Sequence, residues 1–398
     1  VNSDELVDIN WPLEEIASDQ FQIAGGWGGG TFVGSVGVTL NNLSIKNFFK
    51  KGAWRPYPMG QNQRLSISAQ TNGTYYKAFA ISFTDPWMGG RKPNSFTISA
   101  HYSDENNAYY AWQKGTRYFR TAGVAAGLGK RLDWPDPYFT FYAEASYERY
   151  MLKDWNTFVL KNGAANLLSI RLVLGRNSVD QPIYPRRGSD FSVSVQLTPP
   201  YSLWDGKDYK STALSEQERY NWIEFHKWML KGQWFTPLTR NGNLVLMARA
   251  EMGYLGHYNK NKVSPFERFE VGGDGMTGYN MYGIDIISMR GYDDGALDPV
   301  GSNYSCAYNK YTMELRYPLL LKGQTNIYVL GFLEGGNGFT SWKEFSPFKI
   351  KRSAGIGVRL FLPVVGMVGV DWGWGFDPAA GQTKRSGSHI HFTMGMQF

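Results

Sequence analysis

Short segments that alternate strictly between apolar and polar residues recur along this chain, and they constrain its fold more than any other feature. In residues 168–174 every even-numbered position is leucine or isoleucine, while Ser169 and Arg171 stand between them. Successive side chains of a β-strand point to opposite faces, so this pattern places the large apolar side chains on one face. Charged residues in the middle of such segments, such as Glu144 and Asp371, indicate that the other face meets water.

Turns rich in glycine, proline, asparagine and aspartate separate these segments. The expected strands lie near residues 20–28, 31–41, 62–72, 75–84, 94–104, 115–129, 137–151, 164–176, 188–199, 219–235, 242–258, 307–318, 325–335, 348–361, 365–376 and 387–398. An even number of strands suits a barrel whose two ends lie on the same side of a membrane. We therefore expect an all-β fold over residues 19–398, a transmembrane antiparallel β-barrel of about 16 strands.

The composition supports a membrane barrel rather than a water-soluble α/β enzyme. Aromatic residues make up 16% of the chain, glycine occurs 46 times, and the mean hydropathy is -0.37. No apolar run is long enough for a transmembrane helix. The net charge of +7 comes from scattered basic residues, which favours contact with anionic lipid head groups over binding of nucleic acid. The single cysteine, Cys306, excludes an intrachain disulfide.

The first and last expected strands together predict a weak seam. The first is rich in glycine towards its end, and glycine in a strand costs backbone entropy and offers no side chain for cross-strand packing. The last strand alternates strictly and ends on an aromatic residue. The expected seam consists of Gly25, Gly26, Trp27, Gly28, Gly29 and Gly30 in the first strand and of His391, Met394, Gly395 and Phe398 in the last. A tight bend or a glycine-rich turn is the alternative explanation of the glycines.

The longest connection between expected strands runs from 259 to 306 and contains the sequence Arg290-Gly291-Tyr292. A loop of this length is expected to be ordered and functional. An arginine beside a glycine at a loop tip is able to reach back into the lumen, where a carboxylate would hold it by a charge-assisted hydrogen bond. Glu334 and Asp371 are the expected partners, and a solvated loop tip is the alternative.

The order of several motifs resembles the barrel of the BamA-type outer-membrane protein assembly family, and the resemblance covers nearly all of the chain. The motifs are the glycine-rich first strand, Phe83-Thr84-Asp85-Pro86-Trp87, Phe266-Glu267-Arg268-Phe269 with Gly272-Gly273, Arg290-Gly291-Tyr292, Glu314-Leu315-Arg316-Tyr317-Pro318, Phe332-Leu333-Glu334-Gly335-Gly336, Gly355-Ile356-Gly357-Val358-Arg359, Pro363-Val364-Val365-Gly366 and Asp371. Two features depart from the family pattern. Glu334 stands where an aspartate is usual, and the long loop is extended before Arg290.

This resemblance implies a fold, a location and a function. The implied fold is a barrel in the outer membrane of a double-membraned bacterium, whose long extracellular loop folds into the lumen. Residues 1–18 would be the tail of a periplasmic POTRA-like domain. The implied function is that of an insertase for outer-membrane proteins, in which the weak seam opens laterally. Its partners would be unfolded outer-membrane protein clients, accessory lipoproteins of an assembly complex and outer-membrane lipids.

Enzymatic chemistry and cofactor binding are not expected. His389 and His391 stand two residues apart on one strand face, but no third histidine or cysteine is near them in the sequence. Motifs of hydrolases, nucleotide-binding loops and calcium loops are absent as well. We therefore expect no catalytic residue, no metal and no cofactor. The alternatives to an insertase are a related translocase that secretes proteins, a passive porin constricted by the long loop, and an outer-membrane enzyme.

Overall fold

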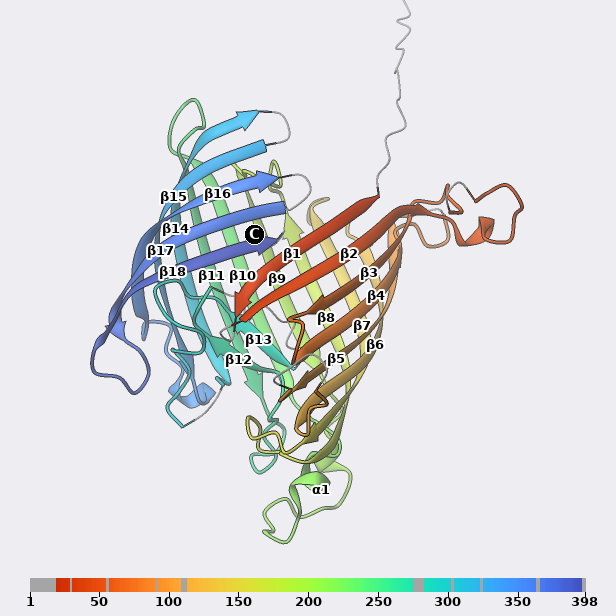
Figure 1. Ribbon diagram of the computed structural model, residues 1–398, viewed down its shortest axis with the longest axis vertical. Coiled ribbons are helices and arrows are strands. Elements are labelled where there is room, and N and C mark those ends of the chain that lie inside the picture. The colour runs from red at the N-terminus through yellow and green to blue at the C-terminus, as the bar shows by residue number, and fades with distance from the viewer. Residues whose placement is uncertain are drawn as a thin grey trace, which may run out of the picture.

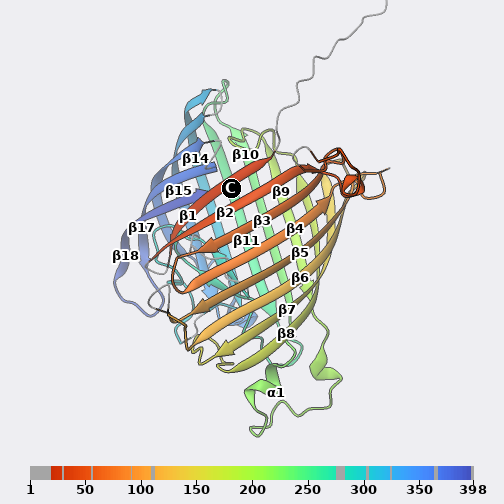
Figure 2. The ribbon, with the colours of Figure 1, turned by 45° about the vertical axis from the view of Figure 1, so that its right-hand side comes forward.

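One curled antiparallel sheet makes up most of the molecule. The computed structural model describes residues 19–28, 31–54, 57–90, 92–108, 113–274, 283–301, 304–322, 325–362 and 366–395. In this part of the chain sixteen strands form the sheet, which curves around a lumen as a barrel (Figure 1, Figure 2). The strands follow one another in chain order, except that β14 follows β11, because β12 and β13 form a separate parallel pair. The expected all-β antiparallel barrel is confirmed.

Each of the sixteen expected strands has its counterpart in this sheet. The sheet strands are β1 (Gln20–Gly28), β2 (Thr31–Leu43), β3 (Gln63–Thr71), β4 (Tyr76–Asp85), β5 (Asn94–Asn106), β6 (Tyr118–Arg131), β7 (Phe139–Lys153), β8 (Gly163–Asn177), β9 (Gly188–Leu197), β10 (His226–Pro237), β11 (Val245–Gly256), β14 (Ala307–Lys322), β15 (Thr325–Phe339), β16 (Lys351–Leu362), β17 (Gly366–Pro378) and β18 (Arg385–Gly395). The separate pair consists of β12 (Arg268–Val271) and β13 (Ile284–Ile287), and α1 (Glu216–Tyr220) is a short helix. Among the described residues no helix has the length and apolar character needed to cross a membrane.

One strand start was wrong by seven residues, whereas the other strand boundaries differ from the expected ones by at most four. The segment expected as a strand from residue 219 enters the sheet only at His226, as β10, because the residues before it include α1. The side chain of Ser215 accepts a hydrogen bond from the backbone N–H of Glu218, and the side chain of Glu218 accepts one from the backbone N–H of Ser215. This capping box satisfies N–H groups that the first turn of a helix leaves unpaired, so the chain makes a helical turn before the strand begins.

The alternation in the sequence becomes the two faces of the barrel wall. On the outer face Ile67 and Ile81 are exposed and lie opposite each other in the β3–β4 ladder. On the inner face the hydroxyl groups of Thr39 and Ser66 share a hydrogen bond of 2.8 Å between β2 and β3. A wall that separates lipid from a polar lumen needs this division of apolar and polar side chains.

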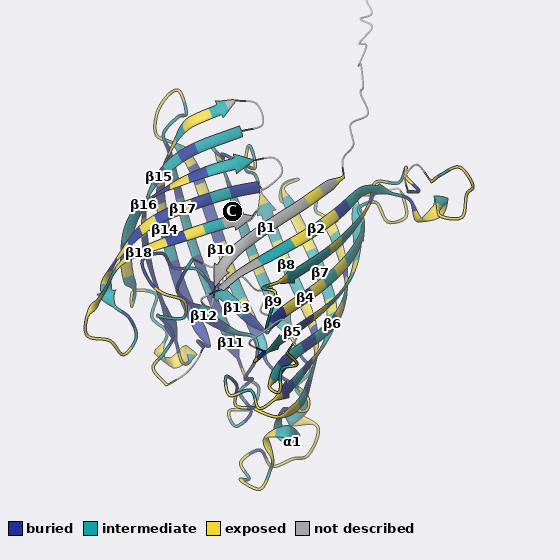
Figure 3. Ribbon diagram, in the orientation of Figure 1, coloured by how far each residue is buried: buried dark blue, intermediate teal, exposed yellow. Residues whose placement is uncertain are grey.

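Buried charge gathers on the inner face of one part of the wall, from β14 to β17. Figure 3 shows buried positions along these strands. The buried charged residues there are Lys310, Glu314, Arg316, Glu334, Arg359 and Asp371. The strand β12, which belongs to the long loop, packs against β14 and β15. The long loop therefore lies inside the barrel, next to the charged part of the wall.

The two ends of the barrel differ in the length of their connections. In Figure 1 the chain enters β1 from the upper end, while α1 and its long connection lie at the lower end. The connections expected to be long, at 200–218 and 259–306, correspond to residues 198–225 and 257–306. Both join strands at the end opposite the start of β1, since each follows a strand that runs in the same direction as β1.

The change Ile81→Arg tests the assignment of the outer face. We expect this variant to lower the free energy of unfolding by about 2–4 kcal/mol, because a charge on the lipid face near the bilayer midplane must be desolvated. Ser82→Arg, at the next position and on the lumen face, should have a much smaller effect. Urea unfolding of the chain in lipid vesicles measures both variants, and equal losses would contradict the assignment.

Candidate functional site

Arg290 lies at the centre of a buried group of charges between the long loop and the barrel wall. Its Nη2 is 2.7 Å from Glu334 and 2.7 Å from Glu314, and its Nε donates to Glu334 at 3.0 Å. Its Nη1 is 3.6 Å from Asp371, and its Cζ is 3.7 Å from the ring centroid of Phe332. Burial by itself lowers the pKa of Arg290, but the surrounding carboxylates outweigh burial and raise the pKa above its ordinary value. The guanidinium is therefore charged at any physiological pH.

Two further arginines balance the carboxylates around Arg290. Arg316 Nη2 is 2.7 Å from Glu314, and Arg359 donates to both oxygens of Asp371, at 2.8 and 2.7 Å. We call this set the arginine cluster. It consists of Arg290, Glu314, Arg316, Glu334, Arg359 and Asp371. Buried charges are tolerated when each has an opposite charge and hydrogen bonds, and the alternating signs of this cluster supply both.

Glu334 holds both the side chain and the backbone of Arg290. One of its carboxylate oxygens accepts from the guanidinium, and the other accepts from the backbone N–H of Arg290 at 2.8 Å. The glutamate, which replaces the aspartate usual in BamA-type barrels, thus reaches two groups of the loop tip from β15. The structure brings the three expected residues Arg290, Glu334 and Asp371 together, and Glu314 joins them.

The loop tip fits against the wall because glycines meet there. Gly291 has a φ of +86°, a conformation that residues with a side chain rarely adopt. On β17, a Cβ at Gly373 would lie 2.8 Å from the backbone N of Gly291, and a Cβ at Gly375 would meet its carbonyl oxygen. Trp372 and Trp374 alternate with these glycines and are exposed on the outer face. The glycines on the inner face of β17 therefore leave the space that the loop tip fills.

The loop tip is also bonded to the last strand. The backbone N–H of Gly291 donates to Nε2 of His391 at 2.8 Å, and Asp293 lies 3.2 Å from Nδ1 of His389. His391 was expected as a residue of the seam, and its side chain is buried on the inner face of β18, against the loop. The loop tip therefore contacts the strand that forms one side of the seam.

Tyr292 completes the loop tip by packing into the apolar core inside the barrel. Its side chain is fully buried, and its hydroxyl donates to the backbone oxygen of Arg352 on β16 at 2.8 Å. Burial raises the pKa of Tyr292 to about 12, so the hydroxyl keeps its proton and remains a donor. The core around it includes Phe266 and Phe269 from the long loop and Tyr150 from β7.

A second buried ion pair attaches the entry of the long loop to β10, which β11 alone separates from β14. Lys227 on β10 is buried, and its Nζ lies 3.0 Å from Glu267 and 2.8 Å from Asp285. Glu267 also accepts from the hydroxyl of Tyr150 at 3.0 Å, and the rings of Tyr150 and Phe266 stack with centroids 4.3 Å apart. The described residues of the long loop therefore contact the inner face of the wall at β7, at β10 and from β14 to β18.

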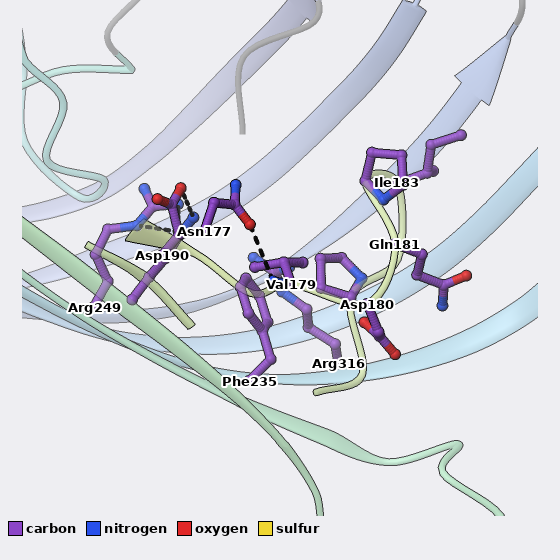
Figure 4. Close-up of a pocket in the computed structure, with 12 residues that line it drawn as sticks. Asn177, Val179, Asp180, Gln181, Ile183, Asp190, Phe235, Arg249 and Arg316 are labelled. Atoms are coloured by element: carbon purple, nitrogen blue, oxygen red, sulfur yellow. Dashed lines mark hydrogen bonds between the residues drawn. The ribbon is translucent and has the colours of Figure 1, made fainter. Parts of the chain in front are cut away.

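The turn between β8 and β9 reaches across to the same wall from the end where the chain enters β1. Tyr184 of this turn donates its hydroxyl to the backbone oxygen of Arg316 at 3.0 Å, and its ring lies 5.1 Å from that of Tyr328 on β15. The pocket beside the turn has a volume of about 320 Å³, and Asp190, Arg249 and Arg316 are among its lining residues (Figure 4). Through Arg316 the arginine cluster thus extends to this pocket.

The seam lies between β1 and β18, the two ends of the sheet. β1 pairs with β2 from Gln20 to Gly28, but within the described residues no ladder joins β1 to β18. Cα atoms of the two strands nevertheless come within 8 Å of each other. The two edges are therefore adjacent without the regular hydrogen bonding found between the other neighbouring strands.

The expected seam residues are distributed over these two edges. Gly25, Gly26, Trp27 and Gly28 lie in β1, while His391, Met394 and Gly395 lie in β18. Gly29, Gly30 and Phe398 lie outside the described residues, as does the segment 1–18. Gly25 faces Gly34 in the β1–β2 ladder, so this cross-strand pair contributes no side-chain packing.

Sequence reasoning missed several members of this site. Glu314, Arg316 and Arg359 were noted only as parts of motifs, although the first two stand two residues apart and so share the lumen face of one strand. Lys227 was missed because the face pattern of the expected strand 219–235 is ambiguous. Alternation in the sequence predicts whether a charged side chain faces the lumen or the lipid. It does not predict which residue of another strand or loop pairs with that charge.

The comparisons with known proteins identify the family. Residues 59–398 match the model of the Omp85 superfamily domain. The chain belongs to the Omp85 superfamily. It is 23% identical over 334 residues to the outer membrane protein assembly factor BamA of Neisseria meningitidis serogroup B, an alignment that covers 79% of this chain and 34% of that protein. The chain thus spans about a third of the length of this relative.

Solved structures support the same fold. The BamA of Haemophilus ducreyi, crystallised without POTRA domains 1–3, matches 94% of this chain and 68% of its own with a TM-score of 0.63 and 17% identity. CdiB from Escherichia coli matches 96% of this chain and 63% of its own with a TM-score of 0.59 and 12% identity. The superfamily and these likenesses confirm the resemblance to BamA-type barrels and place the chain in the outer membrane of Gram-negative bacteria.

Replacing Arg290 by alanine tests the energetic role of the arginine cluster. We expect Arg290→Ala to cost about 3–5 kcal/mol of stability, because Glu334 then remains buried without its main partner. The double variant Arg290→Met with Glu334→Gln should recover part of this loss, since it removes both charges. Arg352→Ala is a matched control, because that arginine pairs with Asp377 on the surface, where an ion pair contributes about 1 kcal/mol or less. Urea unfolding in vesicles compares the variants, and equal losses for Arg290→Ala and Arg352→Ala would contradict the account.

The change Gly373→Ala tests the fit of the loop tip against β17. The added methyl group would collide with the backbone of Gly291, so we expect the loop tip to be displaced at a cost of about 1–3 kcal/mol. Gly331→Ala is the control, because the nearest atom to a Cβ there is 3.9 Å away. Limited proteolysis of residues 257–306 in the folded barrel reports the displacement. Faster cleavage is expected for Gly373→Ala alone, and unchanged cleavage would show that the contact does not hold the loop.

Proposed function

We propose that this chain is the barrel of an insertase that folds outer-membrane proteins into the membrane through the seam between β1 and β18. The observation that carries the proposal is the sheet itself, which begins at β1 and ends at β18 with no ladder between them in the described residues. The similarity of the chain to BamA, a relative whose name describes assembly of outer-membrane proteins, supports the same function.

The physical need for such an edge follows from the membrane. A β-strand inside the hydrocarbon core must pair all its backbone N–H and C=O groups, because no water is there to bind them. An unpaired edge of an existing sheet offers these partners to an incoming strand, which adds to the sheet by backbone hydrogen bonds. β1 is the edge proposed to separate most easily, because Gly25, Gly26 and Gly28 have no side chains for cross-strand packing.

The two edges of the seam are supported unequally. β18 is bonded to the loop tip through His391 and His389, and the loop tip is bonded to β14, β15 and β17 through the arginine cluster. β1 has its backbone ladder with β2, and at its start Asp19 accepts from Tyr57 and from the backbone of Asn41. On this account β18 stays with the rigid wall, whereas β1 moves and receives the client strand.

The proposed reaction uses no covalent chemistry. Pairing of the client's strands is itself favourable in lipid, so the barrel needs to lower a barrier and does not need to supply energy. The expected absence of a catalytic residue and of a cofactor remains part of the proposal. The clients would be unfolded outer-membrane proteins, and accessory lipoproteins of an assembly complex and a POTRA-like domain ending at residues 1–18 would deliver them.

A protein translocase is the second candidate. The barrels of CdiB from Escherichia coli and Acinetobacter baumannii match this chain with TM-scores of 0.59 and 0.57, little below that of the BamA barrel, so fold alone does not separate members of the superfamily. A translocase would move its client through the lumen, and the seam would stay closed. The long loop would then have to leave the lumen, which requires breaking the buried pairs of Arg290 and Lys227.

A disulfide across the seam distinguishes these functions. Each variant carries one cysteine at Ala24 in β1 and a second cysteine in β18, at Thr393 or at one of its neighbours. Cys306 is changed to serine in every variant, so that no other thiol is present. Under oxidation we expect the cross-linked chain to stop inserting an unfolded outer-membrane protein into vesicles, and reduction should restore insertion.

The control is a disulfide of the same kind between β3 and β4, at Ser68 and Ala80, which face each other in a ladder of the closed part of the wall. It should leave insertion unchanged. Normal insertion by the seam-locked chain would overturn lateral opening, and release of a client into the vesicle interior by the locked chain would favour the translocase.

A further inference from the structure

The connection between β2 and β3 carries exposed aromatic and basic side chains that neither the fold nor the seam requires. We call residues 44–62 the basic aromatic loop. The segment contains Lys46, Lys50, Lys51 and Arg55 and no acidic residue. The three lysines are exposed, and so are its large apolar side chains Ile45, Phe48, Phe49, Trp54 and Met59. Phe49 is 92% exposed although its ring lies 5.3 Å from that of Phe48, and so large an exposure is unusual for a phenylalanine.

Hydrogen bonds within the loop keep these side chains exposed. At its base the backbone N–H of Ser44 donates to the oxygen of Pro58 at 2.8 Å, and the side chain of Asn47 donates to the oxygen of Met59 at 2.9 Å. At its tip the indole N–H of Trp54 donates to the backbone oxygen of Phe48 at 3.0 Å, and the two rings lie 5.1 Å apart. The aromatic side chains are thus displayed together on an ordered support.

The position of the loop relative to the barrel limits what it can touch. In Figure 1 and Figure 2 the loop projects outward from the wall, at the end where the chain enters β1. The β4–β5 and β6–β7 turns at the same end display Trp87 and Trp134, which are exposed on neighbouring parts of the rim. Tryptophans at the rim of a membrane barrel form a belt at the level of the lipid head groups. The basic aromatic loop continues this belt sideways, over the lipid beside β2 and β3, the strands that it joins.

We propose that the basic aromatic loop binds the surface of the bilayer beside the seam, with its aromatic side chains among the lipid head groups and its lysines against anionic phospholipids. An apolar ring cluster flanked by cations and free of acidic residues fits such a surface by both area and charge. Each lysine near an anionic membrane contributes about 1 kcal/mol, which corresponds to about a fivefold increase in partition. The loop thereby holds the lipid-facing side of β2 at a fixed depth, next to the strand that forms one edge of the seam.

The depth of residue 49 in a bilayer tests this proposal directly. The full chain carrying Phe49→Cys and Cys306→Ser is labelled with a nitroxide and inserted into vesicles with or without phosphatidylglycerol in a phosphatidylcholine background. We expect the label to collide more with oxygen than with a water-soluble nickel chelate, and the preference should be stronger with phosphatidylglycerol. Phe348→Cys is the matched control, because Phe348 is 90% exposed at the opposite end of the barrel and outside the basic aromatic loop.

A charge reversal separates lipid binding from simple exposure. Lys46→Glu, Lys50→Glu and Lys51→Glu together should return the label at residue 49 to water, whereas the same reversal at Lys161, Lys207 and Lys210, at the other end, should not. The proposal would be overturned if, in anionic vesicles, the label at residue 49 were as exposed to water as the label at residue 348. The basic aromatic loop would then be a binding site for an acidic protein surface. A depth independent of phosphatidylglycerol and of the lysines would overturn the selectivity for anionic lipid.

Discussion

Arg290 carries its charge into the interior of the barrel, where three carboxylates from β14, β15 and β17 surround it. Arg290 is buried, and loss of its carboxylate partners would leave its charge uncompensated, so the loop that bears it is bound to the wall. Glu334 strengthens this attachment by holding the backbone of Arg290 as well as its side chain. The position of the loop tip against β14, β15 and β17 depends on this contact.

The same attachment makes the two edges of the sheet unequal. The residues after Arg290 lie against glycines of β17 and donate to a histidine of β18, so the last strand is held from the inside of the barrel. β1 is held by its ladder with β2 and by contacts at its start, and its glycines have no side chains to pack against a neighbouring strand. Under the proposed function, a barrel with one rigid and one weakly held edge would open at a defined place while the rest of its wall stays folded. The basic aromatic loop would attach β2, the neighbour of the weakly held strand β1, to the surface of the bilayer.

Much of the fold could be predicted from the sequence because a strand between lipid and water must alternate. All sixteen sheet strands were expected, and the error at β10 arose where a capping box at Ser215 produced a helical turn that alternation does not detect. Arg290, Glu334 and Asp371 were expected as one group, but Glu314 was not, since alternation gives the face of a strand and not the distance across a lumen. The role of His391 and of the β17 glycines depends on the docked loop, and their local sequence carries no sign of it. The sequence gives no sign of the role of the basic aromatic loop, because only the structure shows that its rings remain exposed.

Hydrogen exchange of the folded barrel in a bilayer, with wild-type chain and Arg290→Ala compared residue by residue, tests the central claim most directly. If the arginine holds the loop tip and the loop tip holds β18, the variant exchanges faster in residues 284–298 and in the β17–β18 ladder, while β3 to β8 exchange as in the wild type. Faster exchange in the loop alone would contradict the proposed link to the last strand. A uniform change over all sixteen strands would contradict the claim that the arginine cluster acts on one edge of the barrel.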